Sequence, residues 1–133
     1  DPAERSRFLN VLRDIGIENT VLFSTHLVAD VEELCHDLAI INSGTVLLHD
    51  TPTNILQGLA GTISSKAIEK EDLPFFHERF SILSSSYNQD NSLQIRAYLK
   101  EESEGFERAQ PNLEDAYFIA LSQESSTPIN RLT

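Results

Sequence analysis

The residue whose type and position most directly suggest chemistry is His26. It follows a short β-type run at residues 20–24 and precedes a helical pattern that begins at Leu27. Open α/β folds bind ligands at the carboxyl ends of their strands, where an imidazole can donate to a phosphate oxygen or exchange a proton with water. The alternative is a structural histidine whose ring caps the following helix, and position alone favours it. We interpret Ser24 and Thr25 as ordinary caps of the following helix.

The other reactive side chains do not predict a second site. Cys35 and His36 are adjacent, but neighbouring side chains of a helix point about 100° apart and do not readily hydrogen-bond each other. An inert, partly buried thiol is therefore the favoured interpretation of Cys35. His49 and His77 share no metal-ligand spacing with the other histidines, and no CxxC or HExxH pattern occurs. No metal site is predicted.

The sequence lacks the phosphate-binding loop of P-loop nucleotide hydrolases. That loop requires G-x-x-x-x-G-K-[ST], and no Gly-Lys pair occurs in the chain. Residues 61–66 begin with glycine and end with lysine, but they lack the second glycine and the following helix. We therefore expect that this chain alone cannot hold a nucleoside triphosphate.

An amphipathic helix is expected at the start of the chain. Asp1 can cap free backbone amides, and Pro2 has no amide hydrogen to lose in the first turn. Gly16 is expected to supply the left-handed residue that ends the helix. The apolar stripe of this helix is predicted to consist of Phe8, Leu12 and Ile15, flanked by Leu9 and Val11.

An alternating α/β order is expected to follow. Residues 20–24 are β-branched and apolar, which is typical of a strand buried on both faces in a parallel sheet. Further elements are predicted in order: a helix from Leu27 with apolar positions at Val31, Leu34 and Leu38, strands at 38–41 and 45–48 joined in a hairpin by 42–44, and a helix capped by Thr51 that runs to about Leu59.

The composition changes near residues 58–61, which we interpret as a domain boundary. The predicted division is 1–60, a small α+β unit at 61–123, and a flexible tail at 124–133. The α+β unit should contain strands at 62–68, 81–87 and 92–99 and helices at 71–80 and 112–122. The last helix is expected to bury Leu113, Tyr117, Ala120 and Leu121, and to begin with a cap formed by Asn112 and Asp115.

Charge and composition exclude several classes of protein. The 133-residue chain has 21 acidic and 10 basic residues, a net charge of −11, and its basic groups do not cluster, which disfavours nucleic acid. No apolar run approaches the length of a membrane-spanning helix. The single cysteine, Cys35, fits a reducing compartment, taken to be the cytoplasm. Because the sequence opens with Asp1 rather than Met, we expect it to be part of a longer gene product.

Several motifs occur in an order that matches a known family. Asp1-Pro2, the run 21–26, the segment 38–44 and Asp50-Thr51-Pro52 together resemble the latter part of an ABC transporter ATP-binding subunit. The likeness covers about residues 1–58. One departure is Asp50, where the family commonly has glycine; this changes the turn slightly and does not touch the chemistry.

The rest of the chain is similar to the small C-terminal extension of export-type ATPase subunits, mainly through residues 111–118. The resemblance implies an α/β partial nucleotide-binding domain, the C-terminal part of a P-loop NTPase fold, followed by a small α+β domain. It also implies that Asp1 ends the D-loop and that His26 is the switch histidine of the H-loop.

The mechanism implied by the resemblance is shared between two chains. Two ATPase subunits, expected as a homodimer, would sandwich ATP and Mg²⁺; His26 would contact the γ-phosphate, and Asp1 would act across the dimer. A membrane permease would hold the subunit at the inner face of the membrane without direct insertion. The full-length protein would be an ATPase, whereas this chain alone, without the Walker A, Q-loop, signature and Walker B elements, is expected to be inactive.

A non-enzymatic role is the alternative from a different class. The C-terminal unit at 62–122 has a separate composition and no reactive constellation. It would then serve as a dimerisation or regulatory module.

Overall fold

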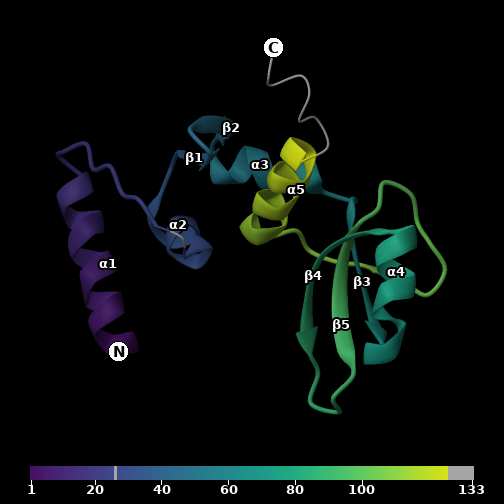
Figure 1. Ribbon diagram of the computed structural model, residues 1–133. Coiled ribbons are helices and arrows are strands. Elements are labelled where there is room, and N and C mark those ends of the chain that lie inside the picture. Colours follow the sequence, from purple (N-terminus) through teal and green to yellow (C-terminus); the bar gives the residue numbers. More distant parts are fainter. Residues whose placement is uncertain (26, 126–133) are drawn as a thin grey trace.

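A computed structural model describes residues 1–25 and 27–125 (Figure 1). The first helix, α1, spans Pro2–Gly16 and is capped by Asp1, as predicted. Its end differs from the prediction, because the C-cap residue Ile17 is right-handed with φ of −63°. Leu9 is the buried residue of the helix, whereas Phe8 and Ile15 are exposed. The predicted apolar stripe is therefore largely uncovered.

The predicted strand at residues 20–24 is wrong. This segment forms no strand, and Leu22 is 99% exposed. A strand is stabilised by backbone hydrogen bonds to a neighbour, and within the described residues no strand pairs with it. The two described sheets are both antiparallel, so the expected parallel sheet is not observed.

The helix after residue 27 is shorter than its apolar pattern predicts. Helix α2 spans Val28–Leu34, and Leu38 instead begins strand β1, Leu38–Asn42. Strand β1 pairs with β2, Thr45–Asp50, in the predicted hairpin. The turn residues Ser43 and Gly44 have φ of +50° and +77°, the backbone that tight hairpin turns require. Helix α3, Pro52–Leu59, follows with the predicted Thr51 cap.

The remaining elements form a four-stranded sheet with helices. They are β3 (Ile63–Ile68), the 3-10 turn η1 (Lys70–Asp72), α4 (Leu73–Arg79), β4 (Ser81–Tyr87), β5 (Leu93–Tyr98), β6 (Glu107–Arg108) and α5 (Leu113–Ser125). The strand order is β4-β5-β3-β6. The short strand β6 was not predicted, while the other strands and helices lie where the pattern placed them.

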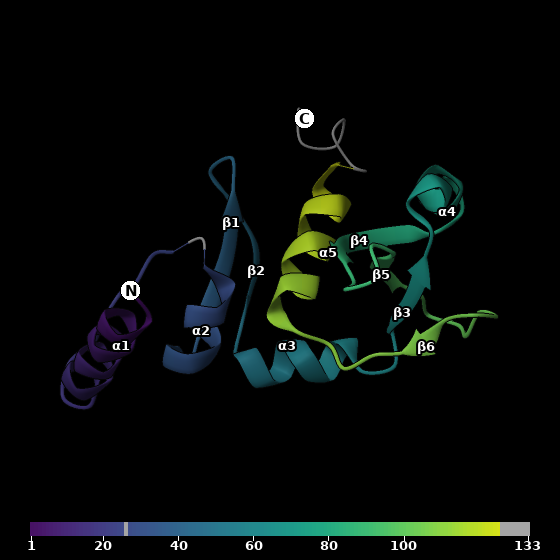
Figure 2. The same cartoon turned by 90° about the horizontal axis from the view of Figure 1, so that it is seen from below.

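Helices α4 and α5 cover opposite faces of this sheet (Figure 2). Side chains alternate along β5: Leu93 and Ile95 join a core with Leu73 and Phe76 on the α4 side. Arg96 points to the other face and binds α5. The alternation that defines a strand therefore assigns one helix to each face.

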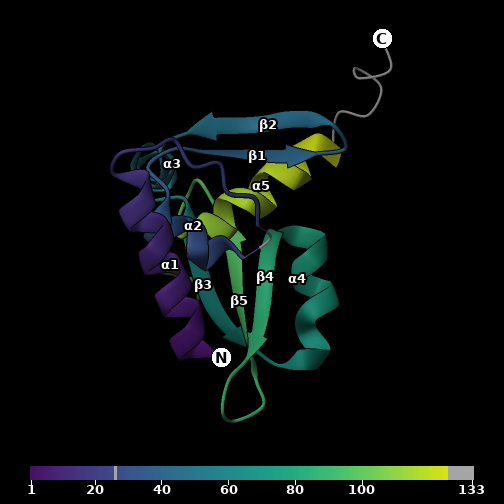
Figure 3. The same cartoon turned by 90° about the vertical axis from the view of Figure 1, so that its left-hand side faces the viewer.

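Helix α5 also packs against the first part of the chain. Leu113 and Ala116 form a core with Ile55 of α3, and Val28 and Val31 of α2 pack on it. In Figure 3 the β1–β2 hairpin lies along α5. Helix α5 reaches Ser125, so residues 124 and 125 are helical rather than part of a tail, and residues 126–133 lie outside the described part of the chain. The division near residue 60 stays a prediction.

The fold is a small mixed α/β arrangement with two antiparallel sheets. The P-loop NTPase fold implied by the resemblance stays a prediction. Among the helices that the structure describes, none has the length and apolar character required to cross a membrane.

Candidate functional site

The predicted site residue His26 lies outside the described residues, so only its flanks can be placed. On the N-terminal side, the Thr25 hydroxyl oxygen accepts a hydrogen bond from the Leu27 backbone amide at 2.9 Å. On the C-terminal side, α2 begins at Val28, and the Leu27 carbonyl accepts a bond from the Asp30 amide. The N-cap residue of α2 is Leu27, and no side-chain capping hydrogen bond is formed there. The predicted cap by Thr25 is therefore wrong, because the Thr25 hydroxyl binds the amide of the residue that precedes the helix.

Helix α1 anchors α2 through two arginines. Arg5 forms an ion pair with Asp30, whose residue is only 5% exposed. Arg13 donates from Nη2 to the backbone carbonyl of Glu33 at 2.8 Å. A buried carboxylate needs a partner to remain charged at low cost. Both arginines of α1 therefore bind oxygen atoms of α2, and these contacts join the two helices.

The second predicted site residue, Asp1, is exposed at the start of α1. Its carboxylate accepts a hydrogen bond from the Ala3 amide at 3.0 Å. This contact satisfies one of the free amides of the first turn. In the structure Asp1 has a local capping role, and its D-loop role stays a prediction.

The described residues do not fit a complete triphosphate site. Such a site needs backbone amides and cations that converge on the phosphates. Arg5 and Arg13, the basic groups beside α2, are already bound to protein oxygens. ATP and Mg²⁺ therefore remain an implication of the resemblance.

The remaining reactive groups are dispersed. Burial raises the pKa of the Cys35 thiol, which agrees with an inert thiol. Cys35 and His36 both follow the end of α2, so the helical geometry assumed for them does not apply. His49 lies 3.0 Å from the Asp37 carboxylate, and this hydrogen bond raises the pKa of the imidazole. Within residues 1–25 and 27–125, no cluster of three His, Cys, Asp or Glu side chains could hold a metal ion.

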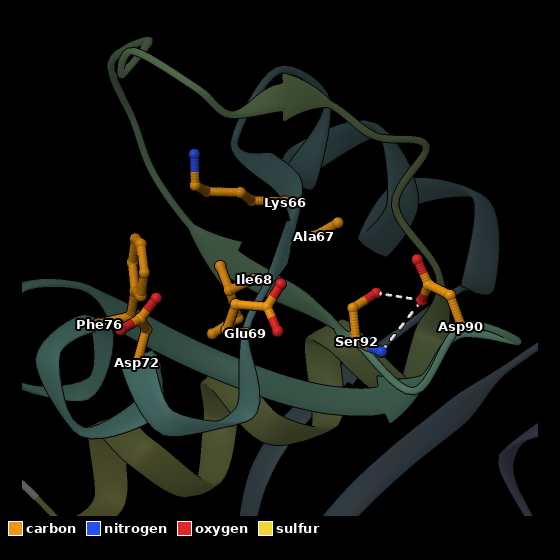
Figure 4. Close-up of a pocket in the computed structure, with 8 residues that line it drawn as sticks. All are labelled: Lys66, Ala67, Ile68, Glu69, Asp72, Phe76, Asp90 and Ser92. Carbon is orange, nitrogen blue, oxygen red and sulfur yellow. Dashed lines mark hydrogen bonds between the residues drawn. The ribbon is translucent and has the colours of Figure 1, made fainter.

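A shallow pocket of about 360 Å³ lies in the C-terminal unit, distant in sequence from the predicted site residues (Figure 4). Lys66 is its basic residue; Nζ lies 5.9 Å from the Phe76 ring centre and also faces Phe106. Its acidic lining residues are Glu69, Asp72 and Asp90. Three carboxylates against one ammonium disfavour an anionic ligand such as a nucleotide. The pocket does not support a phosphate-binding role.

Part of the chain is similar to a known protein. No family model matches the chain. A "Putative ABC transporter ATP-binding protein" from Mycoplasma pneumoniae (strain ATCC 29342 / M129 / Subtype 1) is 32% identical over 57 residues, which is 41% of this chain and 18% of that protein. The chain thus spans less than a fifth of the length of this curated relative. The similarity is consistent with a relationship to ABC-type ATPases and does not extend to the whole of that protein.

Proposed function

We propose that this chain is the C-terminal part of an export-type ABC transporter ATP-binding subunit. The main support for this proposal is the stretch of 57 residues that is 32% identical to an ABC-type protein. The β1–β2 hairpin and the Thr51-capped α3 add support, because they fall where the ordered motifs predict them. In this proposal the complete protein couples ATP hydrolysis to transport through a membrane permease, with a second ATPase subunit as partner.

Within this proposal His26 is the γ-phosphate contact and Asp1 acts across the dimer. Bound ATP and Mg²⁺ would supply the phosphoryl group and its charge compensation. The chain's own contribution would be positioning: α1 holds α2 through Arg5 and Asp30, and α2 begins two residues after His26. Positioning and electrostatic stabilisation carry most of the catalysis of phosphoryl transfer.

The decisive test is His26→Ala in the complete subunit. We expect turnover to fall by about 100-fold or more while ATP binding is retained, because one positioned polar contact is worth about two to three decades in rate. His77→Ala, on α4 beyond the hairpin, is the matched control and should leave turnover unchanged. Unchanged turnover in the His26 variant would contradict the proposal. This chain alone should show no ATPase activity.

A second candidate is a non-enzymatic interaction role for the C-terminal unit. Strand β4 is an edge strand of seven residues, none of which is charged. Uncharged edges can pair with other strands. Light scattering on the whole 133-residue chain tests this role, since α5 needs α2 and α3 to cover it. If the chain remains monomeric at high concentration, the proposed dimerisation role is refuted.

A further inference from the structure

Helix α2 caps the beginning of helix α5, although 81 residues separate the two contact points. The Glu32 carboxylate accepts a hydrogen bond from the Leu113 backbone amide at 3.3 Å. The first amides of a helix have no partner within the helix, and a negative charge beside them is favourable. Glu32 therefore supplies to α5 an acceptor that α5 itself does not provide for Leu113.

The apolar sides of the two helices also meet. Val28 and Val31 of α2 pack against the buried cluster that Leu113 and Ala116 form with Ile55 of α3. Helix α2 has seven residues, and isolated helices of this length are unstable in water. Its helical conformation consequently depends on what it packs against, which is α5 together with α1 and α3.

The opposite end of α5 contacts the hairpin. The Asn42 side chain at the end of β1 donates to the Glu124 carboxylate at 2.7 Å. Contacts at both ends hold α5 along the first part of the chain (Figure 3). The helix is therefore fixed in orientation as well as in position.

The sheet holds the same helix from the other side. Arg96 of β5 binds both oxygens of Asp115 on α5, at 3.0 and 2.7 Å. Asp115 is 1% exposed, and a buried pair with two parallel contacts is geometrically specific. A displacement of the sheet would be transmitted to α5 through this pair.

We propose that Glu32 is a positioning residue and that the C-terminal sheet sets the placement of α2 through α5. Two contacts with the first turn of α5 support this proposal. Glu32 of α2 accepts from the first turn on one side, and Arg96 of the sheet binds Asp115 in the same turn from the other. The link itself is a property of this chain. Its consequence, regulation of ATP hydrolysis by the C-terminal unit, rests on the proposed function.

Hydrogen exchange of the 133-residue chain tests the contact at Glu32. Glu32→Ala should speed amide exchange of residues 28–34 by about fivefold, the effect of a lost helix cap. Glu32→Gln keeps an acceptor oxygen and should restore slow exchange. Glu33→Ala is the matched control, because Glu33 is the neighbouring exposed glutamate of α2 and its side chain points in a different direction from that of Glu32. Equal effects of the alanine variants at 32 and 33 would overturn the role of Glu32.

The sheet side needs a separate pair of variants. Arg96→Met removes the ion pair with Asp115 on α5 and changes no residue of α2. We expect the amide exchange rate of residues 28–34 to rise. Arg108→Met is the control, because Arg108 binds Ser64 and the Leu99 carbonyl within the C-terminal unit. Faster exchange confined to the sheet and α5 in the Arg96 variant would overturn transmission to α2.

Turnover measurements on the complete subunit distinguish the structural link between the sheet and α2 from its proposed effect on ATP hydrolysis. Glu32→Ala should lower kcat several-fold with an unchanged KM for ATP, and Glu33→Ala should leave both unchanged. The exchange experiments need no nucleotide, so their failure leaves the proposed ATPase role standing. If the link holds in exchange but kcat of the Glu32 variant is unchanged, the regulatory consequence is refuted. Failure of the ATPase role appears instead as unchanged turnover of the His26 variant.

Discussion

Arg96 and Asp115 form a two-contact ion pair that joins strand β5 to helix α5, and the same carboxylate also accepts from the Asn112 amide. The contact with Asp115 raises the pKa of the Arg96 guanidinium, which stays charged. Arg96 additionally donates to the Gln110 carbonyl at 2.7 Å. Each oxygen of a carboxylate that is 1% exposed thus has a donor. This satisfied network fixes the first turn of α5 on the sheet.

Removing one partner of this pair should be costly. Asp115→Ala leaves the Arg96 charge without its counter-ion and uncaps α5, so the free energy of unfolding should fall by about 3 kcal/mol. Urea unfolding followed by circular dichroism measures this loss. Glu114→Ala, at an exposed neighbouring position, should change stability by about 0.5 kcal/mol or less. Similar losses in both variants would contradict the structural role of the pair.

The His49 imidazole should titrate above its ordinary value of 6.5, because it hydrogen-bonds the Asp37 carboxylate. The raised folded-state pKa means that the contact stabilises the hairpin below the unfolded pKa and that this contribution is lost as pH rises through the folded pKa. Histidine NMR titration should show the pKa falling toward 6.5 in Asp37→Asn. Asp14→Asn, on α1, should leave the His49 titration unchanged; an equal shift there would contradict the assignment.

Asp50 should titrate below its ordinary value. Its carboxylate accepts from the Asn54 side chain at 2.9 Å and from the Thr51 amide at 2.7 Å, and these bonds lower the pKa of Asp50. The stabilisation is present above the unfolded pKa and is lost as pH falls through the folded pKa. We expect Asp50→Ala to lower Tm at pH 7 and to converge with the native chain in acid. A constant Tm difference down to low pH would contradict this linkage.

Cys35 should react slowly with thiol reagents. Burial raises the pKa of its thiol, so a smaller fraction is thiolate at neutral pH, and the thiolate is the reactive form. A chromogenic disulfide reagent at pH 7.5 should modify the folded chain more slowly than the urea-unfolded chain. Equal rates in the folded and unfolded chains would show that the thiol is freely accessible.

Local patterns predicted the elements whose stabilising contacts are close in sequence. The hairpin at 38–50 follows from two β-type runs and a Ser-Gly turn, and α3 follows from the Thr51 cap, whose hydroxyl accepts from the Asn54 amide at 3.1 Å. The cap of α5 was also predicted, and Asn112 and Asp115 do exchange hydrogen bonds. In each case the deciding groups lie within about a dozen residues.

Contacts between distant segments could not be predicted in this way. The strand expected at 20–24 depends on a partner strand, which no local pattern supplies. The buried side of α5 was predicted only in part: Leu113 is buried as expected, but Tyr117 is exposed. Ala116 and Ile119, which the prediction did not name, are buried. Apolar spacing alone does not say which side of a helix meets its neighbours. Likewise, nothing near Arg96 in the sequence identifies Asp115 as its partner.

The hairpin turn offers a last prediction from backbone geometry. Ser43 and Gly44 both have positive φ, a conformation that costs non-glycine residues about 1 kcal/mol. Ser43→Gly should relieve this strain and Gly44→Ala should add to it, so the two substitutions should shift Tm in opposite directions. At position 44 an added Cβ has nothing within 4 Å, so the expected cost of Gly44→Ala is conformational and not steric. Gly58→Ala is the control, because Gly58 lies inside α3 with space for a methyl group and should raise stability slightly. If Gly44→Ala were as well tolerated as Gly58→Ala, the turn would not adopt this conformation in solution.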